Sequence, residues 1–595
     1  MIKREGIEGI EEIIKIFNQA WMEMHCPFVT LKIADKDGSK SSNILSIENG
    51  EVYIKPDIVP KGCDPQKYLL WFFRHELAHV HHCPYDLRTA YSLEKAAYEV
   101  VGNWDLAYLA THLFADLQIN INYLPRRFGE IPYFMRILRS RRLSFLEQLL
   151  QEVYFLINPI SKSRNKNLQD VAKEILAVML LDKPWHSKVR ILAIILDKLR
   201  TLYPRAFSEK KIEKYVRENV LRVREDFLPN SLRMFEEIFG GISNAPDAEK
   251  FFKQWIEPRL SPEEKERMKK MIEERAKMHK AKGKGKGKRI RMLKEGDKSI
   301  KEKVSKRGLK KPVGEGLEEP SLPTSLSTIY GKIPKEVFNE AFWKKFWYRS
   351  RAEKVIMHYL SENPSKKPVW AVVKYPDDWY IEDEIEDLDI DISLDEGPLM
   401  PEVTTLKWVE EPMSHGQSLV TGFVPSEITV LDASLSMSKI HDDAATAAFI
   451  AYLSAKKAGG ETAVITFSTQ FFSADWDSSE DLKELVLSMN FEGYTIFPAY
   501  EIERMVSERV GNSFIVIITD GGWQNINEAI PILEKIADSG HKIVIFLLPG
   551  GEYPEKIALL KKNPHLSMYE VKKPEVELQN LVLSQAVKTY RAFLP

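Results

Sequence analysis

The sequence predicts a multidomain protein with an α-rich N-terminal part that contains some strand (α+β), a helical middle, and a C-terminal doubly wound α/β domain with a parallel sheet. Three observations lead to this fold class. The chain has 595 residues, which corresponds to about four domains of ordinary size. Four apolar strands alternate with helical stretches within residues 413–595. Basic and acidic residues gather in separate stretches before that region, as is typical of segments between domains.

Composition excludes several classes of protein. Lys and Arg number 85 and Asp and Glu 86, so the formal net charge is -1, and a uniformly basic nucleic-acid-binding chain is excluded. Cys26, Cys63 and Cys83 form no CxxC pair, which argues against a disulfide framework and a thiolate zinc site. The charged start lacks a signal-peptide core, and no run of about 18 apolar residues could span a membrane. We therefore expect a cytoplasmic protein.

Residues 1–130 are expected to form the first domain. Short strands are predicted at 28–33 and 51–54, where a turn-rich segment separates apolar residues. The apolar stretches 69–80 and 93–123 are long enough to predict buried helices.

The middle of the chain divides by composition. Residues 131–274 have amphipathic spacing and predict a helical region. A basic flexible linker is expected at 275–325, because its part 275–311 holds 17 Lys or Arg against 3 Asp or Glu, a net charge of +14. An acidic connecting segment is expected at 326–412, with 11 Asp or Glu and no Lys or Arg between 377 and 396.

Residues 413–595 are expected to form the α/β domain. The predicted strands are ITVLD (428–432), TAVITF (462–467), FIVIIT (514–519) and KIVIFLL (542–548). The predicted helices are 440–457, 497–509, 524–538 and 573–590. Continuous apolar strands that alternate with helices predict a parallel sheet covered on both faces.

The stretch WFFRHELAHV carries the first candidate site, at His75, Glu76 and His79. Two histidines four residues apart project from one face of a helix and can share a Zn²⁺ ion. Glu76 lies beside them, where it can act as the general base toward an activated water. The alternative is that HExxH occurs by chance in an apolar structural helix.

A catalytic zinc site needs a third protein ligand and one open position. Asp116 is the candidate, and His112 and Asn120 lie one turn before and after it on the same predicted helix face. We expect His112 and Asn120 to hold the ligands through hydrogen bonds. Glu94 and Glu99 are alternative ligands, and a hydrogen-bonded network without metal is the alternative for the whole polar stripe.

HELAH (75–79) and FADLQIN (114–120) resemble the zinc-dependent metallopeptidase-like domains that prokaryotes fuse to von Willebrand factor A-like domains. The resemblance covers about residues 60–125. It implies a zincin-like helix pair with an acidic third zinc ligand, and peptidase activity on undefined substrates.

A second candidate site lies at the predicted carboxyl ends of the C-terminal strands. Asp432, Ser434 and Ser436 form a DxSxS turn, Thr495 lies on a loop before a helix, and Asp520 follows the strand FIVIIT. Open α/β sheets bind ligands at this edge. Carboxylate and hydroxyl oxygens are ligands suited to Mg²⁺ or Mn²⁺.

DASLS, Thr495 and TDG resemble the metal-ion-dependent adhesion site (MIDAS) of the von Willebrand factor A family, over about residues 425–595. The resemblance implies that Ser434, Ser436 and Thr495 coordinate Mg²⁺ through their hydroxyls. Asp432 and Asp520 act mainly through water, and a protein partner supplies a carboxylate. EGYT stands where many relatives have GGT. The segment 379–408 resembles the region before this domain in stand-alone prokaryotic relatives, which are often associated with MoxR-type AAA+ ATPases.

Two functions from different classes follow. The leading hypothesis is a zinc metallopeptidase whose C-terminal domain binds a partner or substrate carboxylate through Mg²⁺. The alternative is a non-enzymatic adaptor that works with a MoxR-type ATPase and has a structural or degenerate N-terminal metal site.

The basic stretch 275–311 is expected to be a solvated linker, with non-specific nucleic-acid binding or an electrostatic latch onto 377–396 as alternatives. Nucleotide binding is not predicted, because neither GxGxxG nor GxxxxGK[ST] occurs in the right context.

Overall fold

The computed structural model describes most of the chain, and the statements below concern that part. The described residues are 10–25, 30–33, 45–48, 51–54, 63–136, 145–158, 166–218, 220–227, 231–260, 266, 335–362, 372–380, 383, 387–401, 404–412, 424–491, 493–551 and 563–590. The chain divides into two compact units, Met1–Arg351 with Gln470–Phe472 and Ser479–Phe491, and Ala352–Thr469 with Ser473–Ser478 and Glu492–Pro595. None of the helices in the described ranges combines the length and apolar character needed to cross a membrane.

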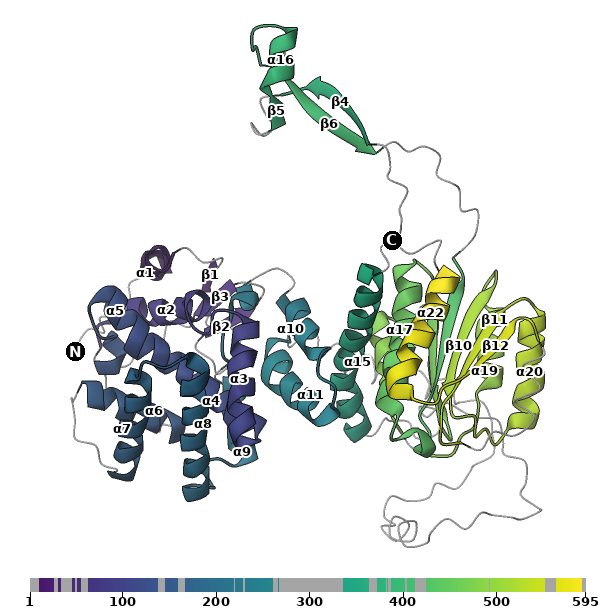
Figure 1. Cartoon of the computed structure of the whole chain (residues 1–595), viewed down its shortest axis with the longest axis horizontal. Coiled ribbons are helices and arrows are strands. Elements are labelled where there is room, and N and C mark those ends of the chain that lie inside the picture. Colours follow the sequence, from purple (N-terminus) through teal and green to yellow (C-terminus); the bar gives the residue numbers. More distant parts are fainter. Residues whose placement is uncertain are drawn as a thin grey trace, which may run out of the picture. The chain divides into compact units, whose positions relative to one another are not determined.

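The first unit is mainly helical (Figure 1). Its principal helices are α1 (Ile10–Glu23), α2 (Pro65–His81), α3 (Leu87–Val101), α4 (Trp104–Leu117), α5 (Leu124–Phe128), α6 (Phe145–Ile157), α7 (Lys166–Leu180), α8 (Trp185–Leu202), α9 (Glu209–Glu218), α10 (Ser231–Phe239), α11 (Ala245–Phe251) and α18 (Glu480–Leu487). A three-stranded sheet accompanies them: β3 (Glu51–Ile54) pairs in parallel with β1 (Thr30–Ile33) and antiparallel with β2 (Leu45–Glu48). The predicted strands near 28–33 and 51–54 are confirmed, whereas β2 was not predicted.

The single buried helix predicted at 93–123 is wrong, because the chain breaks it into α3 and α4. Gly102 ends α3 with a left-handed backbone (φ 60°), which glycine adopts without a steric penalty. Asn103 then caps α4 by accepting a hydrogen bond from the backbone N–H of Leu106. A π-helical turn, η2 (Gln118–Tyr123), continues α4. The polar residues of this stretch therefore lie on α4 and η2.

The segment predicted to be a simple acidic connector contains regular structure. The 28-residue helix α15 (Lys335–Glu362) includes the boundary between the two units. The strands β4 (Val372–Asp378), β6 (Leu406–Pro412) and β5 (Leu388–Asp389) form an antiparallel sheet in that order, with α16 (Ile390–Glu396) between β5 and β6 in the sequence. The proposed basic linker at 275–325 lies outside the described residues.

The second unit contains most of a six-stranded sheet whose order is β12-β11-β10-β7-β8-β9 (Figure 1); the first two residues of β9 are assigned to the first unit. Its strands are β7 (Ser426–Asp432), β8 (Thr462–Phe467), β9 (Phe471–Ala474), β10 (Ser513–Thr519), β11 (Lys542–Leu547) and β12 (Leu566–Glu570). The predicted alternation of apolar strands and helices is confirmed. The helices are α17 (His441–Lys457), α19 (Ala499–Ser507), α20 (Ile526–Asp538) and α22 (Gln579–Tyr590), and they cover both faces of the sheet.

The expectation of a wholly parallel sheet is wrong at one edge. All pairings from β12 through β8 are parallel. The edge strand β9 follows β8 after only residues 468–470, and a connection this short permits only an antiparallel hairpin. The strand order runs in one direction from β7 and in the other from β10, so the neighbouring strands β7 and β10 form the switch point where such sheets bind ligands.

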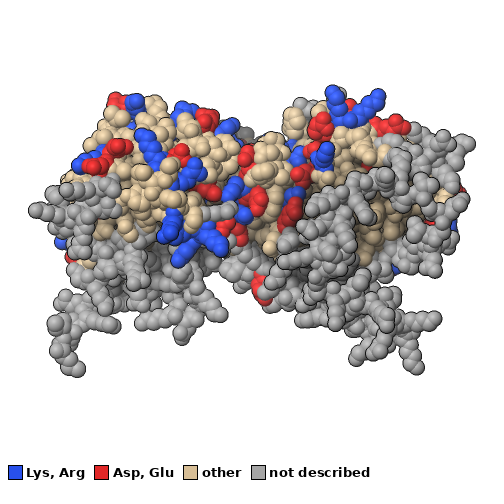
Figure 2. Space-filling model, turned by 90° about the horizontal axis from the view of Figure 1, so that it is seen from below, with Lys and Arg blue, Asp and Glu red and all other residues tan. Residues whose placement is uncertain are grey.

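Positive and negative side chains are intermingled on the described surface drawn in Figure 2. Neither Lys and Arg nor Asp and Glu cover that face alone. Among the described residues of this face, no extended purely basic surface is visible.

Candidate metal sites

Helix α2 presents the two histidines of the HExxH motif on one face. The helix begins at Pro65, and Asp64 before it caps the first turn by accepting the backbone N–H of Lys67 at 3.1 Å. His75 and His79 lie four residues apart in the middle of this helix. Their rings consequently project toward the same side.

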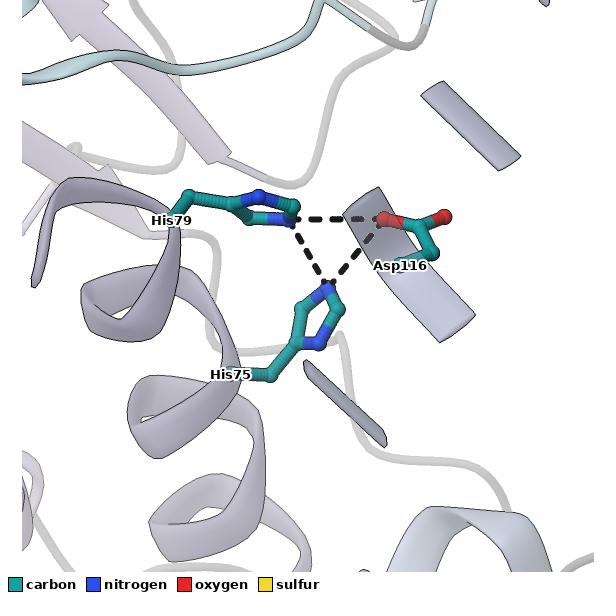
Figure 3. Close-up of side chains that lie close together, drawn as sticks. All are labelled: His75, His79 and Asp116. Atoms are coloured by element: carbon teal, nitrogen blue, oxygen red, sulfur yellow. Dashed lines mark hydrogen bonds and ion pairs between the residues drawn. The ribbon is translucent and has the colours of Figure 1, made fainter. Parts of the chain in front are cut away.

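Asp116 of α4 meets the two imidazoles from the opposite side (Figure 3). The Nε2 atoms of His75 and His79 lie 3.3 Å apart. Asp116 Oδ1 lies 3.4 Å from Nε2 of His79 and 3.7 Å from Nε2 of His75. Ligand atoms about 2.0–2.2 Å from a tetrahedral zinc ion lie about 3.3–3.6 Å from one another. The triangle therefore has the dimensions of a three-ligand zinc site.

Hydrogen bonds at the far ring nitrogens fix how the imidazoles face this triangle. Nδ1 of His75 lies 2.9 Å from Oδ1 of Asn120, and Nδ1 of His79 lies 3.0 Å from the carbonyl oxygen of Cys83. Both oxygens are acceptors, so each Nδ1 carries the hydrogen and each Nε2 presents a lone pair to the triangle. Asn120 in turn donates to the hydroxyl oxygen of Tyr154 at 2.9 Å.

The pKa values of His75, His79 and Asp116 depend on one another. Burial and the neighbouring His79 lower the pKa of His75 to about 4. Burial also opposes protonation of His79, but its hydrogen bond to Asp116 and the charge of that carboxylate raise its pKa overall. Burial favours the neutral acid of Asp116, yet the surrounding imidazoles of His112, His79 and His75 hold its pKa below the usual range. Zinc ligation requires an ionised Asp116 and neutral imidazoles, so His79 would give up its proton when a metal binds.

Glu76 and His112 border the triangle without joining it. Burial raises the pKa of Glu76, against the opposing charges of His79 and Arg222. His112 Nδ1 lies 3.5 Å from Asp116 Oδ2 and 3.5 Å from the hydroxyl of Tyr215. Sequence reasoning missed Tyr154, Tyr215 and Arg222, because each belongs to a later segment and reaches the site only through tertiary packing.

The alternative ligands lie elsewhere. Glu94 accepts a hydrogen bond from the indole Nε1 of Trp255 at 2.8 Å, and burial raises the pKa of Glu94 to about 8. Glu99 forms an ion pair of 2.7 Å with Arg190 at the surface. Among the described residues, the single cluster of His, Cys, Asp and Glu with metal-binding spacing is His75, His79 and Asp116.

The second candidate site lies where β7 and β10 end. Asp432 is the last residue of β7, and Asp520 follows β10 directly. Both carboxylates are fully buried, and Ser434 and Thr495 are nearly so. Ser436 is exposed, and its Oγ lies 3.1 Å from that of Ser434. The turn therefore places a hydroxyl pair at the mouth of a buried acidic pair.

Glycines allow other loops to approach Asp520. A Cβ atom at Gly522 would lie 3.3 Å from Asp520 Oδ1 and 4.0 Å from Thr495 Oγ1, so both oxygens face this glycine. A Cβ atom at Gly551, after β11, would lie 2.5 Å from the carbonyl oxygen of Asp520. Gly551 is thus a contributor to the site that sequence reasoning missed. A PGG sequence directly after a buried strand was the available signal.

The electrostatics of this edge fit a cation. Burial and the charge of Asp520 raise the pKa of Asp432 to about 7. The Oδ2 atom of Asp520 is buried without a hydrogen-bond partner among the described residues. A buried acceptor left unpaired costs free energy, and a hard divalent ion or its water would satisfy it. Two carboxylates and three hydroxyls form the oxygen-only donor set that Mg²⁺ or Mn²⁺ prefers.

Comparison with known proteins adds little to these sites. No family model matches the sequence, and no curated protein matches it. Several solved structures resemble part of the chain, among them a pilus adhesin and a von Willebrand factor type A protein. The pilus adhesin SpaC from Lactobacillus rhamnosus GG, in an open conformation, is 14% identical over 29% of this chain and 31% of its own, with a TM-score of 0.25. A von Willebrand factor type A protein from Catenulispora acidiphila is 16% identical over 28% of this chain and 42% of its own, with a TM-score of 0.22.

The chain thus spans less than half the length of each of these two solved chains. The second unit itself has an α/β fold, with a mostly parallel sheet and helices on both of its faces.

Proposed function

We propose that this protein is a zinc-dependent metallopeptidase whose C-terminal sheet domain binds a carboxylate of a partner or substrate through Mg²⁺. The observation that carries the enzymatic part is the convergence of His75 Nε2, His79 Nε2 and Asp116 Oδ1 at tetrahedral ligand spacing. Chance occurrence of an HExxH sequence does not by itself explain why a carboxylate from another helix completes the triangle.

The hydrogen bonds around the triangle support a metal more than a purely structural network. When both rings are neutral, their two Nε2 lone pairs face each other at 3.3 Å and also face Asp116 Oδ1, so these three atoms offer one another no donor. One proton or one cation between them relieves the repulsion. The anchored Nδ1 atoms of His75 and His79 hold the lone pairs in place before any metal arrives, which is the usual arrangement around metal-bound histidine.

The roles of the surrounding residues follow from their positions. Zinc, when bound, supplies Lewis-acid activation of water and of the scissile carbonyl. Glu76 would take a proton from the attacking water and return it to the leaving amine as the C–N bond breaks. Burial raises the pKa of Glu76, which makes its carboxylate a stronger base for the first transfer. Arg222 places a positive charge close enough to act on Glu76, where it can also stabilise negative charge on the substrate.

Metal analysis and hydrolysis test the enzymatic proposal together. The purified chain should carry about one zinc ion, and His79→Ala should lose it. Glu76→Gln should keep the zinc but abolish cleavage of unfolded or peptide substrates. His186→Ala is a matched control, because His186 contacts Ser92 and belongs to no metal cluster. Zinc-free wild-type protein would refute the metal site.

The sheet site supports the second part of the proposal. Its serine and threonine hydroxyls carry no charge, so a bound Mg²⁺ would remain electron-poor and would favour a further carboxylate from a partner. Ser434→Ala/Ser436→Ala should abolish Mg²⁺-dependent capture of an acidic partner while the sheet stays folded. Capture that persists in this variant, or in EDTA, would contradict the assignment.

The adaptor function remains a second candidate, because the sheet site draws all its residues from the second unit and needs nothing from the zinc site. In that case a MoxR-type ATPase is the partner to test. Wild-type protein that holds zinc, cleaves no substrate and still binds the ATPase in Mg²⁺ would favour the adaptor. Loss of cleavage in Glu76→Gln would favour the peptidase.

A further inference from the structure

A buried tryptophan lies beside the candidate Mg²⁺ site and takes part in its hydrogen bonds. Trp523 follows the TDGG sequence after β10 and is 2% exposed. Its indole Nε1 donates to Oγ1 of Thr519 at 3.0 Å. Thr519 is the last residue of β10, and its hydroxyl donates to Oδ2 of Asp432 at 2.6 Å. The indole therefore reaches the carboxylate of β7 through one hydroxyl.

The donors around the Thr519 hydroxyl determine the direction of each hydrogen bond between Trp523 and Asp432. Oγ1 of Thr519 accepts two hydrogens, from the indole of Trp523 and from the backbone N–H of Gly521 at 3.0 Å. Its only hydrogen must then point elsewhere, and the acceptor in reach is Asp432 Oδ2. The other oxygen of Asp432 accepts the backbone N–H of Ser434 at 2.9 Å. Both oxygens of this carboxylate are thereby held as acceptors in one orientation.

The ring of Trp523 connects the same carboxylate to the loop that carries Thr495. The indole stacks on Phe497 with ring centroids 4.0 Å apart. Asn525 clamps Phe497 from both sides, with its Oδ1 accepting the Phe497 N–H at 2.8 Å and its Nδ2 donating to the Phe497 carbonyl at 2.9 Å. The backbone N–H of Gln524 donates to the carbonyl of Thr495 at 2.9 Å. One short segment therefore links the loops after β7, before α19 and after β10.

We propose that Trp523 is a positioning residue for the candidate Mg²⁺ site, and that its indole N–H, acting through the Thr519 hydroxyl, holds Asp432 in the orientation in which the site binds the cation. The proposal rests on the Mg²⁺ site proposed above. Without the indole, Thr519 would have one acceptor position free, and its hydroxyl could rotate away from Asp432. Because Mg²⁺ requires nearly ideal octahedral coordination, a carboxylate that is free to rotate should contribute less to its binding. Groups that orient metal ligands typically change metal affinity about 10–100-fold.

The test compares two tryptophan variants by Mg²⁺ titration calorimetry of the full chain. Trp523→Phe keeps a ring to stack on Phe497 but removes the N–H. Trp476→Phe is the matched control, because Trp476 is also buried in the second unit and its Nε1 donates to the carbonyl of Met505 at 3.1 Å, away from the site. We expect Trp523→Phe to bind Mg²⁺ about tenfold more weakly and Trp476→Phe to bind as wild type. Ser434→Ala/Ser436→Ala gives the baseline for binding elsewhere.

A double-variant cycle separates the proposed chain of hydrogen bonds from a general loss of packing. Thr519→Val should weaken Mg²⁺ binding as much as Trp523→Phe does. Thr519→Ser keeps the hydroxyl and should bind Mg²⁺ with wild-type affinity. The double variant should lose no more than either single variant, since both interrupt the same path. Wild-type affinity in Trp523→Phe, or additive losses in the double variant, would overturn the role of Trp523 alone. Absence of Mg²⁺ binding by the wild type, relative to the serine variant, would overturn the metal site itself.

Discussion

Glu427 should make the stability of the sheet domain fall as the pH rises. This residue lies near the start of β7, at the end of the strand opposite Asp432, and it is fully buried. Its Oε1 accepts a hydrogen bond from the Thr429 hydroxyl at 3.0 Å, whereas its Oε2 has no hydrogen-bond partner among the described residues. Burial raises the pKa of Glu427 to about 8, from an ordinary value of 4.5.

The sign and the size of the effect follow from proton linkage. The folded protein binds the Glu427 proton more tightly than the unfolded chain does, so the stabilisation is complete below pH 4.5 and is lost as the pH rises through about 8. A difference of about 3.5 pKa units corresponds to about 5 kcal/mol. For a domain of this size, where 1 kcal/mol moves the melting temperature by about 2–4 °C, the loss amounts to about 10–20 °C between pH 5 and pH 9.

Calorimetry of wild type and Glu427→Gln between pH 5 and pH 9 isolates this group from all other titrations. The amide cannot ionise, so any cost of its extra N–H donors shifts the melting temperature equally at every pH. The two variants should therefore diverge as the pH rises, with the wild-type transition falling more steeply. Glu528→Gln is the control, because Glu528 is an exposed glutamate of α20. Parallel curves for wild type and Glu427→Gln would refute the reasoning.

Three further changes probe the two metal sites. Asn120→Ala removes the oxygen that accepts Nδ1–H of the first histidine, so zinc affinity should fall about 10–100-fold in a chelator competition; an unchanged affinity would argue against this anchor. Gly551→Ala places a methyl group 2.5 Å from the carbonyl oxygen of Asp520, so calorimetry should show a cost of about 1–3 kcal/mol together with weaker Mg²⁺ binding. Arg222→Met should keep the zinc, measured by metal analysis, and slow peptide cleavage because negative charge that develops on the substrate loses a nearby cation; wild-type cleavage at full zinc content would contradict this role.

Uninterrupted apolar strands made the sheet of the second unit predictable. The strand at 462–467 matches β8 at both ends, because a strand buried on both faces has a nearly continuous run of apolar residues. β9 and β12 were missed for the opposite reason. β9 has four residues at the edge of the sheet, and most of β12 is only half-buried, so neither produces a long apolar run. The antiparallel pairing of β9 depends on the short turn at residues 468–470, and the hydrophobic pattern of the strands does not predict that turn.

Local spacing explains what the sequence revealed of the sites. His75 and His79 are neighbours on one helix face, so their convergence could be predicted from four residues of separation. Asp116 was a candidate because it is a carboxylate in an apolar helix, and the structure brings it to both imidazoles. Tyr154 and Arg222 reach the same place from helices and loops far along the chain. Their approach depends on tertiary packing, which no pattern of residue types encodes.

The residues of the two proposed metal sites come together at different stages of protein synthesis. His75 and His79 belong to one helix, and Asp116 lies two helices further on. This coordination triangle can close while the ribosome is still translating the rest of the protein. Thr519 and Asp432, by contrast, are 87 residues apart and meet only through the pairing of β7 with β10. Such distant pairing forms late. The proposed zinc site could therefore form on a nascent chain, whereas the proposed Mg²⁺ site requires that β10 has been synthesised and has paired with β7.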